Sequence, residues 1–277
     1  MDGMQQEYWE QVAGPHWVAA QDFMDALLSP YAEVLRAPLR RHAREQVVDV
    51  GCGCGATTLI ARQEAPSAAV LAVDVSGPML AAAEKRARSA GDQQTRFVHA
   101  DAATYPLPQN SVDLIISRFG LMFFADPAAA FRHMNGWLKP DGRIATVVWS
   151  ERAENPWMTE VIAVVTRMLQ VPASDEEAPG PFSLGRQDRR RSLFQQAGLS
   201  IEEEHRMTEP LTIRGTIDEL VTFYGARGPI SVALAQAEPS ERDRALTALR
   251  KQIEALYEEG GVTLPACALQ LTLRAST

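Results

Sequence analysis

The chain has 277 residues, of which 46% are hydrophobic and 22% charged, a composition that suits one α/β domain with elaborations. Its formal charge of −8 argues against a nucleic-acid-binding surface, because phosphate binding needs clustered cations. The three cysteines make no even-numbered disulfide framework and fit a reducing cytoplasm, and the apolar runs fall far short of the ~20 residues that a membrane-spanning helix needs.

Residues 1–45 precede the first predicted strand. They lack the basic start and apolar core of a signal peptide and instead carry several aromatic side chains. Helical spacing predicts one helix over Trp17 to Leu28, ending at Ser29-Pro30. Such a segment either packs against the body of the domain or forms an N-terminal helical lid over the ligand crevice.

A glycine-rich turn follows the first predicted strand. Val47 to Val50 is an apolar run that suits a buried parallel strand, and Gly51, Gly53 and Gly55 follow at every second position. A helix starting at Ala56 would present free N–H groups beside a ligand. Because Gly51, Gly53 and Ala56 also fit the dinucleotide fingerprint, the turn alone leaves the cofactor open.

Strands and helices then alternate, and acids follow two of the strands. Asp74 ends the second strand about twenty residues beyond the turn, where a carboxylate can accept both hydroxyls of a ribose. Asp101 follows a third strand at 96–99 and could accept from an adenine amino group, with Ala102 offering a backbone N–H. Alternation predicts that His99 turns inward as a packed histidine.

The fourth strand, 112–117, brings Arg118, Phe119 and Met122 to its carboxyl end, where α/β sheets bind ligands. A helix capped by Asp126 follows, and residues 139–142 predict a turn into a fifth strand that ends at Trp149.

The alternation of strands and helices is interrupted after the fifth strand, which predicts cap insertions within one domain spanning 46–277. The insertions are placed at about 150–185, which contains Trp157, and at about 215–259. The remaining predicted elements are a helix at 188–197, a sixth strand at 201–208, helices at 216–237 and 239–259, and a last strand at 267–273.

These motifs together resemble one family. The order Asp49-x-Gly51-x-Gly53-x-Gly55, Asp74, Ala100-Asp101-Ala102, Ser117-Arg118-Phe119-Gly120 and Leu138-Lys139-Pro140-Asp141-Gly142-Arg143 resembles the class I S-adenosylmethionine-dependent methyltransferases. It is most similar to their small-molecule branch, which includes the ubiquinone and menaquinone C-methyltransferases. The resemblance implies a doubly wound, Rossmann-like seven-stranded sheet with the last strand antiparallel, and S-adenosylhomocysteine as the cofactor product.

The resemblance also implies a cofactor site. Asp49 would anchor the turn or the amino group, Asp74 would hold the ribose, Val75 and Met79 would flank the adenine, and Asp101 with Ala102 would read its edge. The remaining predicted cofactor contacts lie in the turn, after the fourth strand and in the lid: Gly51, Cys52, Gly53, Ser117, Trp17 and Gln21.

The predicted reaction is methyl transfer to an O, N or C nucleophile of a small apolar or aromatic molecule, of the kind found in secondary metabolism. A general base is not obligatory; His16 in the lid is the first candidate, although a surface histidine is the plainer interpretation. Substrate contacts are predicted at the strand ends and in the cap: Arg118, Phe119, Met122, Trp149 and Trp157. No metal, nucleic-acid partner or membrane span is expected, and a homo-oligomer is possible.

Two alternatives stay open. An NAD(P)-dependent oxidoreductase fits the glycine turn, but no tyrosine is followed four residues later by lysine, so one common hydride-transfer pair is missing. A methyltransferase-like protein that binds the cofactor without transferring a methyl, as a regulator or scaffold, is the other.

Overall fold

The computed structural model describes residues 3–173 and 175–276. Residues 1–2 of the predicted lid, residue 174 of the predicted cap and residue 277 lie outside the described part. The chain divides into two compact units. The sheet unit comprises Met1–Ser150, Glu177–Arg206 and Ala268–Thr277, and the helical unit comprises Glu151–Glu176 and Met207–Cys267.

The sheet unit is built on a seven-stranded sheet of order β3-β2-β1-β4-β5-β10-β6. Its strands are β1 (Gln46–Val50), β2 (Ala69–Asp74), β3 (Arg96–His99), β4 (Val112–Arg118), β5 (Leu138–Trp149), β6 (Leu199–Met207) and β10 (Ala268–Ala275). Strands β1 to β5 pair in parallel, whereas β10 runs antiparallel to β5. This confirms the predicted doubly wound sheet with an antiparallel last strand.

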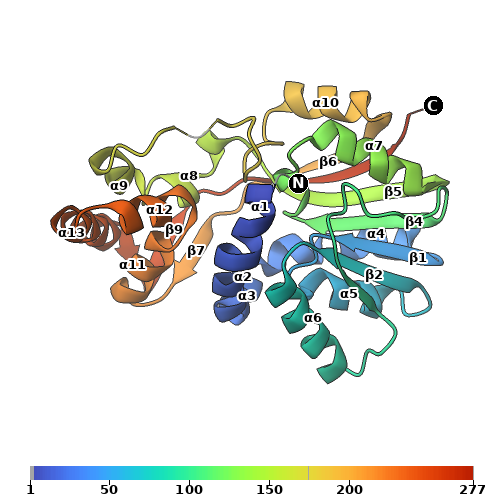
Figure 1. The fold of residues 1–277 in the computed structure, drawn as a ribbon, viewed down its shortest axis with the longest axis horizontal. Helices are drawn as coiled ribbons and strands as arrows, with labels where there is room; N and C mark the ends of the chain where they lie inside the picture. Colours follow the sequence, from blue (N-terminus) through green and yellow to red (C-terminus); the bar gives the residue numbers. More distant parts are fainter. Residues whose placement is uncertain (1–2, 174, 277) are drawn as a thin grey trace. The chain divides into compact units, whose positions relative to one another are not determined.

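Helices cover both faces of this sheet, with α7 and α10 on one side and α5 and α6 on the other (Figure 1). Their bounds are α5 (Ala56–Glu64), α6 (Gly77–Ser89), α7 (Pro127–Trp137) and α10 (Gln187–Gln196). Helix α7 begins as predicted, because Asp126 accepts a hydrogen bond from the Ala129 N–H at 2.9 Å. Its apolar side, which includes Phe131 and Trp137, is fully buried and is therefore core.

The N-terminal helices differ from the prediction. They are α1 (Gly3–Tyr8), a π-helix η1 (Trp9–Ala13), α2 (Gly14–Ala19), α3 (Gln21–Glu33) and α4 (Arg36–His42). The predicted helix from Trp17 is broken at Ala20, and its predicted end at Pro30 is wrong, because α3 continues through this proline. The proline leaves the Ala26 carbonyl without its backbone donor, and the Ser29 hydroxyl donates to that oxygen at 3.0 Å instead.

The predicted turn at 139–142 is also wrong, because these residues lie within β5. The parallel pairing of β4 with β5 shifts register between Val112, which pairs with Leu138, and Leu114, which pairs with Arg143, so residues 139–142 form an irregularity within β5 rather than a separate turn. A Cβ on Gly142 would lie 2.9 Å from the Val112 carbonyl oxygen, so glycine allows this close approach.

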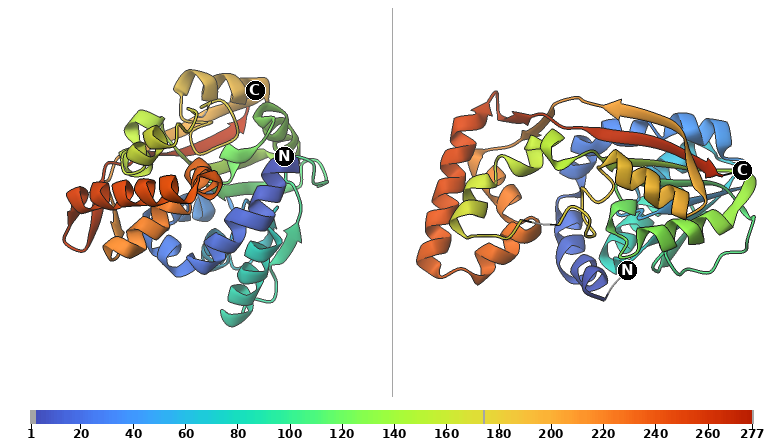
Figure 2. Two further views of the ribbon diagram at one scale, coloured as in Figure 1. Left: turned by 60° about the vertical axis from the view of Figure 1, so that its left-hand side comes forward. Right: turned by 90° about the horizontal axis from the view of Figure 1, so that it is seen from above.

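The helical unit holds helices and a small sheet, with α11, α12 and α13 packed together (Figure 2). Its helices are η3 (Arg152–Glu154), α8 (Pro156–Thr159), α9 (Ala163–Met168), α11 (Ile217–Gly225), α12 (Gly228–Gln236) and α13 (Pro239–Leu256). The sheet has the order β7-β9-β8, from Leu211–Arg214, Gly261–Leu264 and Tyr257–Glu258. The prediction missed this sheet and extended the last helix to residue 259, because strands of two to four residues carry little periodicity.

Candidate active site

The glycine turn after β1 has a backbone that other residues would disturb. Gly51, Gly53 and Gly55 have φ angles of 66°, 56° and 84°, in the left-handed region that glycine adopts without strain. A Cβ on Gly51 would lie 2.8 Å from the Cα of Gly120, which follows β4. A Cβ on Gly53 would lie 3.0 Å from the Cε of Met79. The turn therefore presents bare backbone at the carboxyl edge of the sheet.

Asp49 is the buried acid of this turn. Its Oδ2 accepts hydrogen bonds from the hydroxyls of Thr57 at 2.7 Å and Thr58 at 2.6 Å, so it ties β1 to the start of α5. Burial raises the pKa of Asp49 to about 6, while the threonine hydrogen bonds and Arg118 oppose this rise. Its Oδ1 is buried and has no hydrogen-bond partner among the described residues. A ligand donor would satisfy this oxygen.

Asp74 ends β2 and is 9% exposed. Its Oδ2 accepts the Gly53 N–H at 2.8 Å and its Oδ1 accepts the Ser76 N–H at 2.9 Å. Burial raises the pKa of this carboxyl, and the backbone hydrogen bonds act in the opposite direction. Each oxygen keeps a further acceptor position, so the carboxylate is oriented by the turn and still able to accept from a ribose. Its ribose role stays a prediction.

The residues predicted around the adenine lie at the same edge. Val75 and Met79 are buried at the start of α6, and Ala102 is buried after β3. Asp101 accepts the Ala103 N–H at 2.9 Å through its Oδ1, which fixes the loop that carries it. Because β2 and β3 are paired in parallel, these loops are neighbours, as an adenine site would require.

The N-terminal segment is fastened to this edge by Glu10. Its Oε2 accepts the Gly77 N–H at 2.8 Å, at the start of α6, and lies 3.3 Å from the Nε2 of His99. The same His99 nitrogen lies 2.8 Å from the Val75 carbonyl oxygen. The inward orientation predicted for His99 is wrong: its side chain is 48% exposed, because β3 is an edge strand.

Gly14 brings the same segment into close contact with the α6 loop. A Cβ at this position would overlap the Ser76 hydroxyl oxygen and the Trp9 carbonyl oxygen. The Trp9 ring packs edge-on against Phe123, 5.1 Å between centroids, and lies 6.3 Å from Trp17. The segment therefore reaches from the loop after β2 to the loop after β4, where the predicted lid would cover a ligand.

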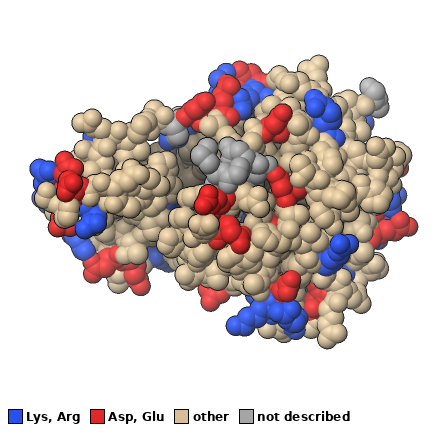
Figure 3. All heavy atoms as spheres, viewed as in Figure 1, with Lys and Arg blue, Asp and Glu red and all other residues tan. Residues whose placement is uncertain are grey.

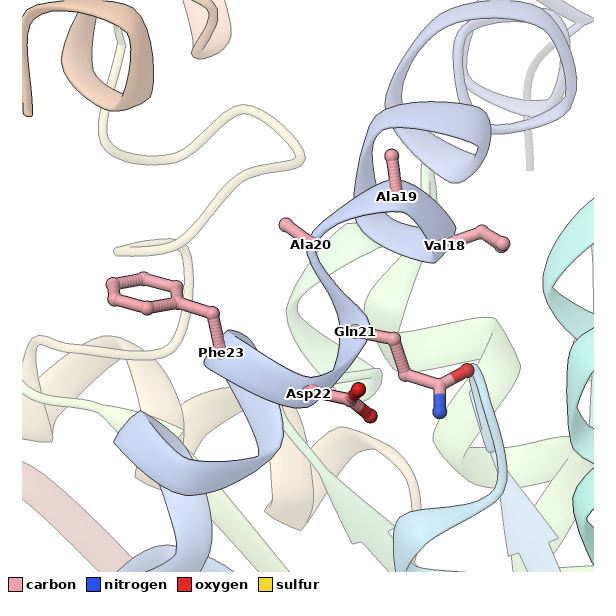
Figure 4. Close-up of a pocket in the computed structure, with 6 residues that line it drawn as sticks. All are labelled: Val18, Ala19, Ala20, Gln21, Asp22 and Phe23. Carbon is pink, nitrogen blue, oxygen red and sulfur yellow. The ribbon is translucent and has the colours of Figure 1, made fainter. Parts of the chain in front are cut away.

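A cavity of about 370 Å³ lies at the junction of α2 and α3, lined by Val18 to Phe23. Its volume is in the range of small-molecule sites. Figure 4 shows the Gln21 carboxamide and the Phe23 ring pointing to opposite sides of the chain. Gln21 thus lines a cavity, whereas His16 is exposed on α2. The catalytic role of His16 stays a prediction that its surroundings do not favour.

Arg118 contacts the N-terminal helices. Its Nη2 lies 3.6 Å from the Asp25 carboxylate and its Nη1 donates to the Leu28 carbonyl at 3.4 Å. Asp25 also pairs with the Nη2 of Arg86 at 2.8 Å, and the Nη1 of Arg86 donates to the Cys54 carbonyl at 2.7 Å. One carboxylate therefore connects the strand end, helix α6 and the glycine turn.

Phe119, which follows Arg118 in the chain, belongs to a cluster of three aromatic rings. Phe119 and Trp149 stack at 4.3 Å and 8°, and Tyr31 packs edge-on to both, at 5.4 and 5.0 Å. Phe119 has a φ of 63°, a strained conformation for a bulky residue that tends to occur at functional sites. Phe119 and Trp149, predicted substrate contacts, thus lie together.

Two other predicted contacts have internal partners. The buried Ser117 hydroxyl donates to the Val50 carbonyl at 2.7 Å and so joins β4 to the turn. Met122 is 2% exposed, and its carbonyl accepts the Ser183 hydroxyl at 2.6 Å and the Gly180 N–H at 3.0 Å. Both residues therefore stabilise the loops around the site through these internal hydrogen bonds.

Trp157 belongs to the helical unit. It is 5% exposed, its indole N–H donates to the Asn155 side chain at 3.3 Å, and its backbone N–H donates to the Pro265 carbonyl at 3.3 Å. Its contact with a substrate stays a prediction.

The family of residues 48–146 follows from comparison with known proteins. A family model described as a methyltransferase domain matches residues 48–146, which run from β1 into β5 and contain the glycine turn, Asp74 and Asp101. These residues form a class I S-adenosylmethionine-dependent methyltransferase domain. The chain also shares its fold with the YcgJ protein of Bacillus subtilis, on which it superimposes with a TM-score of 0.60 at 20% identity, covering 90% of this chain and 99% of that one.

Relatives of this methyltransferase domain include two bacterial enzymes. A demethylmenaquinone methyltransferase of Thermus thermophilus is 33% identical over 105 residues, 38% of this chain and 47% of the relative. A trans-aconitate 2-methyltransferase of Variovorax paradoxus is 31% identical over 173 residues, 62% of this chain and 60% of the relative. The chain therefore spans about half to three fifths of the length of these relatives.

The residues of the domain fit S-adenosylmethionine. The bare glycine backbone, the oriented Asp74 carboxylate and the unpartnered Asp49 oxygen offer contacts to its ribose and its amino-acid arm. Glu10 and Asp25, which attach the N-terminal helices to the domain, are not among the site residues predicted from the sequence. Asp25 stands three residues before the buried Leu28, and an acid on a buried helical stripe is the signal that could have revealed it.

Proposed function

We propose that the chain transfers the methyl group of S-adenosylmethionine to a nucleophilic O, N or C atom of a small apolar or aromatic molecule. The observation that carries the proposal is the glycine turn held between Asp49 and Asp74 in a domain of this family. When bound, the cofactor supplies a methyl group on a cationic sulfonium, which is a good leaving group.

The chain's own part is to bind, orient and exclude water. The turn and Asp74 fix the adenosine, and the N-terminal segment attached by Glu10 covers the same edge of the sheet. Alignment of the reacting atoms in a closed, dry site provides much of the acceleration in such displacements, so no base is required. We therefore expect His16→Ala to be a useful negative control rather than an inactive variant.

Phe119 and Trp149 support an apolar or aromatic acceptor. Phe119 follows β4, the neighbour of β1, and Trp149 ends β5, the next strand of the sheet, and their stacked arrangement offers a flat apolar wall. Met122 and Arg118 are less suited to touch the acceptor, because their polar atoms contact other parts of the domain.

Two measurements test the proposed function. Thermal-shift titration compares S-adenosylmethionine with NADH, and we expect stabilisation by the first; stabilisation by NADH alone would contradict the proposal. Incubation with S-adenosylmethionine and a panel of phenols, quinones and prenyl compounds should then give a product one methyl heavier. Binding without any methylated product across a broad panel would favour a regulator or scaffold.

Asp74→Asn tests the ribose role. The amide keeps one acceptor oxygen but loses the charge and one acceptor, so S-adenosylhomocysteine should bind roughly tenfold more weakly. Isothermal titration calorimetry gives the dissociation constants. Asp126→Asn is the matched control, because Asp126 is the N-cap of α7, the helix that follows β4. This variant should bind S-adenosylhomocysteine with unchanged affinity. Equal affinities for Asp74→Asn and the native chain would refute the role.

Gly14→Ala tests the lid. The added methyl group overlaps the Ser76 hydroxyl and should push the N-terminal segment away from α6, so S-adenosylhomocysteine should dissociate about fivefold faster, as a contact worth about 1 kcal/mol would predict. Stopped-flow displacement measures this rate. Glu10→Gln, which weakens the attachment at Gly77, should act in the same direction. Unchanged rates in both variants would mean that the segment is not a lid.

We also propose that the chain acts in the cytoplasm and has no nucleic-acid partner. In the described ranges no helix is long and apolar enough to cross a membrane. On the face drawn in Figure 3, basic and acidic side chains are interspersed, which supports a small-molecule partner over nucleic acid. Size-exclusion chromatography with light scattering would determine whether the chain forms a homo-oligomer.

A further inference from the structure

The amino-acid arm of S-adenosylmethionine carries a carboxylate and an ammonium group, and a closed site must match both charges. This requirement rests on the proposed function. Buried charges without partners are costly, so the residues that meet the arm should include a cation and an acceptor at the edge of the sheet.

Arg118 is the cation at this place. It ends β4, one residue after Ser117, whose hydroxyl holds the Val50 carbonyl, and two residues before Gly120, which touches Gly51. Arg118 is therefore adjacent to the glycine turn.

The guanidinium of Arg118 is poorly satisfied. Its side chain is 10% exposed, and its two polar contacts among the described residues, with Asp25 and Leu28, are long at 3.6 and 3.4 Å. A guanidinium has five N–H donors in a fork that matches a carboxylate, so donors remain for another anion. Burial lowers the pKa of Arg118, and the carboxylates of Asp25 and Asp49 act in the opposite direction.

Asp49 supplies the acceptor. Its Oδ2 is engaged by Thr57 and Thr58, whereas its buried Oδ1 lacks a donor within the described chain. The strand register brings Asp49 and Arg118 to the same edge, because Asp49 of β1 pairs with Ile116 of β4, two residues before Arg118. An acceptor and a cation thus lie beside one turn, which is the charge pattern complementary to a zwitterionic amino acid.

We propose that Arg118 binds the carboxylate of the cofactor's amino-acid arm and that Asp25 is the positioning residue for Arg118, while Asp49 keeps the contact with the ammonium group that the family resemblance implies. The Asp25 carboxylate contacts both Arg118 and Arg86, but its single negative charge can neutralise only one of these two positive charges. Arg86 also donates to the Cys54 carbonyl of the glycine turn. Helix α3 is thereby linked to the same arm of the cofactor, and Arg118 is assigned to the cofactor rather than to the acceptor.

A thermodynamic cycle that compares the native chain and Arg118→Met, each with two ligands, tests the assignment. The ligands are S-adenosylmethionine and its decarboxylated form, which keep the same sulfonium, ammonium and adenosine and differ in the carboxylate. The native chain should bind the decarboxylated ligand on the order of tenfold more weakly, and Arg118→Met should bind both ligands with nearly the same affinity. Calorimetry reports binding without reference to activity.

Two further variants make the result decisive. The double variant Asp25→Asn/Arg118→Met removes both charges of the pair, and it should fold and show the same loss of discrimination between the two ligands. Arg88→Met changes an exposed arginine on α6 and should keep the native ratio of the two dissociation constants. If the Arg118 variants keep the native ratio of affinities for the two ligands, the assignment is overturned. If the native chain binds neither ligand, the proposed function itself fails; binding of both with unaltered discrimination in the variants defeats the Arg118 inference alone.

Discussion

Gly51→Ala is expected to reduce the affinity for S-adenosylhomocysteine at least a hundredfold and to lower the free energy of unfolding by about 2–4 kcal/mol. Alanine is strained at a φ of 66°, and its Cβ would lie 2.8 Å from the Cα of Gly120, a backbone atom that cannot rotate away. Either the turn or the loop after β4 must then move. Urea unfolding and calorimetric titration measure the two effects.

Gly91→Ala is the matched control for Gly51→Ala. Gly91 has a φ of 80°, so it carries the same conformational penalty, but no atom lies within 4 Å of its added Cβ in the described chain. We expect a loss of about 1 kcal/mol in stability and native cofactor affinity. If Gly51→Ala behaves like this control, the contact with Gly120 does not shape the cofactor site.

Asp49→Asn is expected to flatten the pH dependence of stability. Burial raises the pKa of Asp49 from 3.8 to about 6. Its contribution to stability is therefore fully present below the unfolded-state pKa and is lost as the pH rises through about 6. The roughly 2-unit difference corresponds to about 3 kcal/mol, so the native chain should lose about this much more free energy of unfolding than the variant between pH 4 and pH 7. Urea unfolding without cofactor at several pH values measures it.

Asp113→Asn is the control of opposite sign. Burial raises the pKa of Asp113, but the N–H groups of Gln46 and Glu45 and the ammonium of Lys139 lower it more, so the net shift is downward. Its stabilisation is present above the unfolded-state pKa and is lost as the pH falls. Asp113→Asn should therefore be less stable than the native chain at pH 7, with a gap that narrows in acid. Parallel profiles for Asp49→Asn and the native chain would contradict the assigned shift.

The central sheet could be predicted from the sequence because its signals are local. The apolar run before Gly51, the acid after β2 and the cap at Asp126 each specify their own element within a few residues. The order of these elements, together with the family resemblance, then implied the antiparallel last strand. The same local rules placed the glycines and both acids at one edge of the sheet.

The partners of the lid could not be predicted because they are distant in sequence. Glu10 meets Gly77 across 67 residues, and the Leu28 carbonyl meets Arg118 across 90. No spacing rule connects such pairs. For this reason Arg118 was expected to face a substrate, whereas the fold pairs it with Asp25.

The contact between Gly51 and Gly120 has a consequence for engineering. Gly51 belongs to the turn that we expect to hold the cofactor, and Gly120 directly follows Phe119, which we propose as a wall for the acceptor. Because these two backbones are in direct contact, no side chain lies between them that could adjust if either one moved. A substitution that widens the acceptor side by moving Phe119 should therefore also change the affinity for the cofactor, so directed evolution of acceptor range should monitor both properties together.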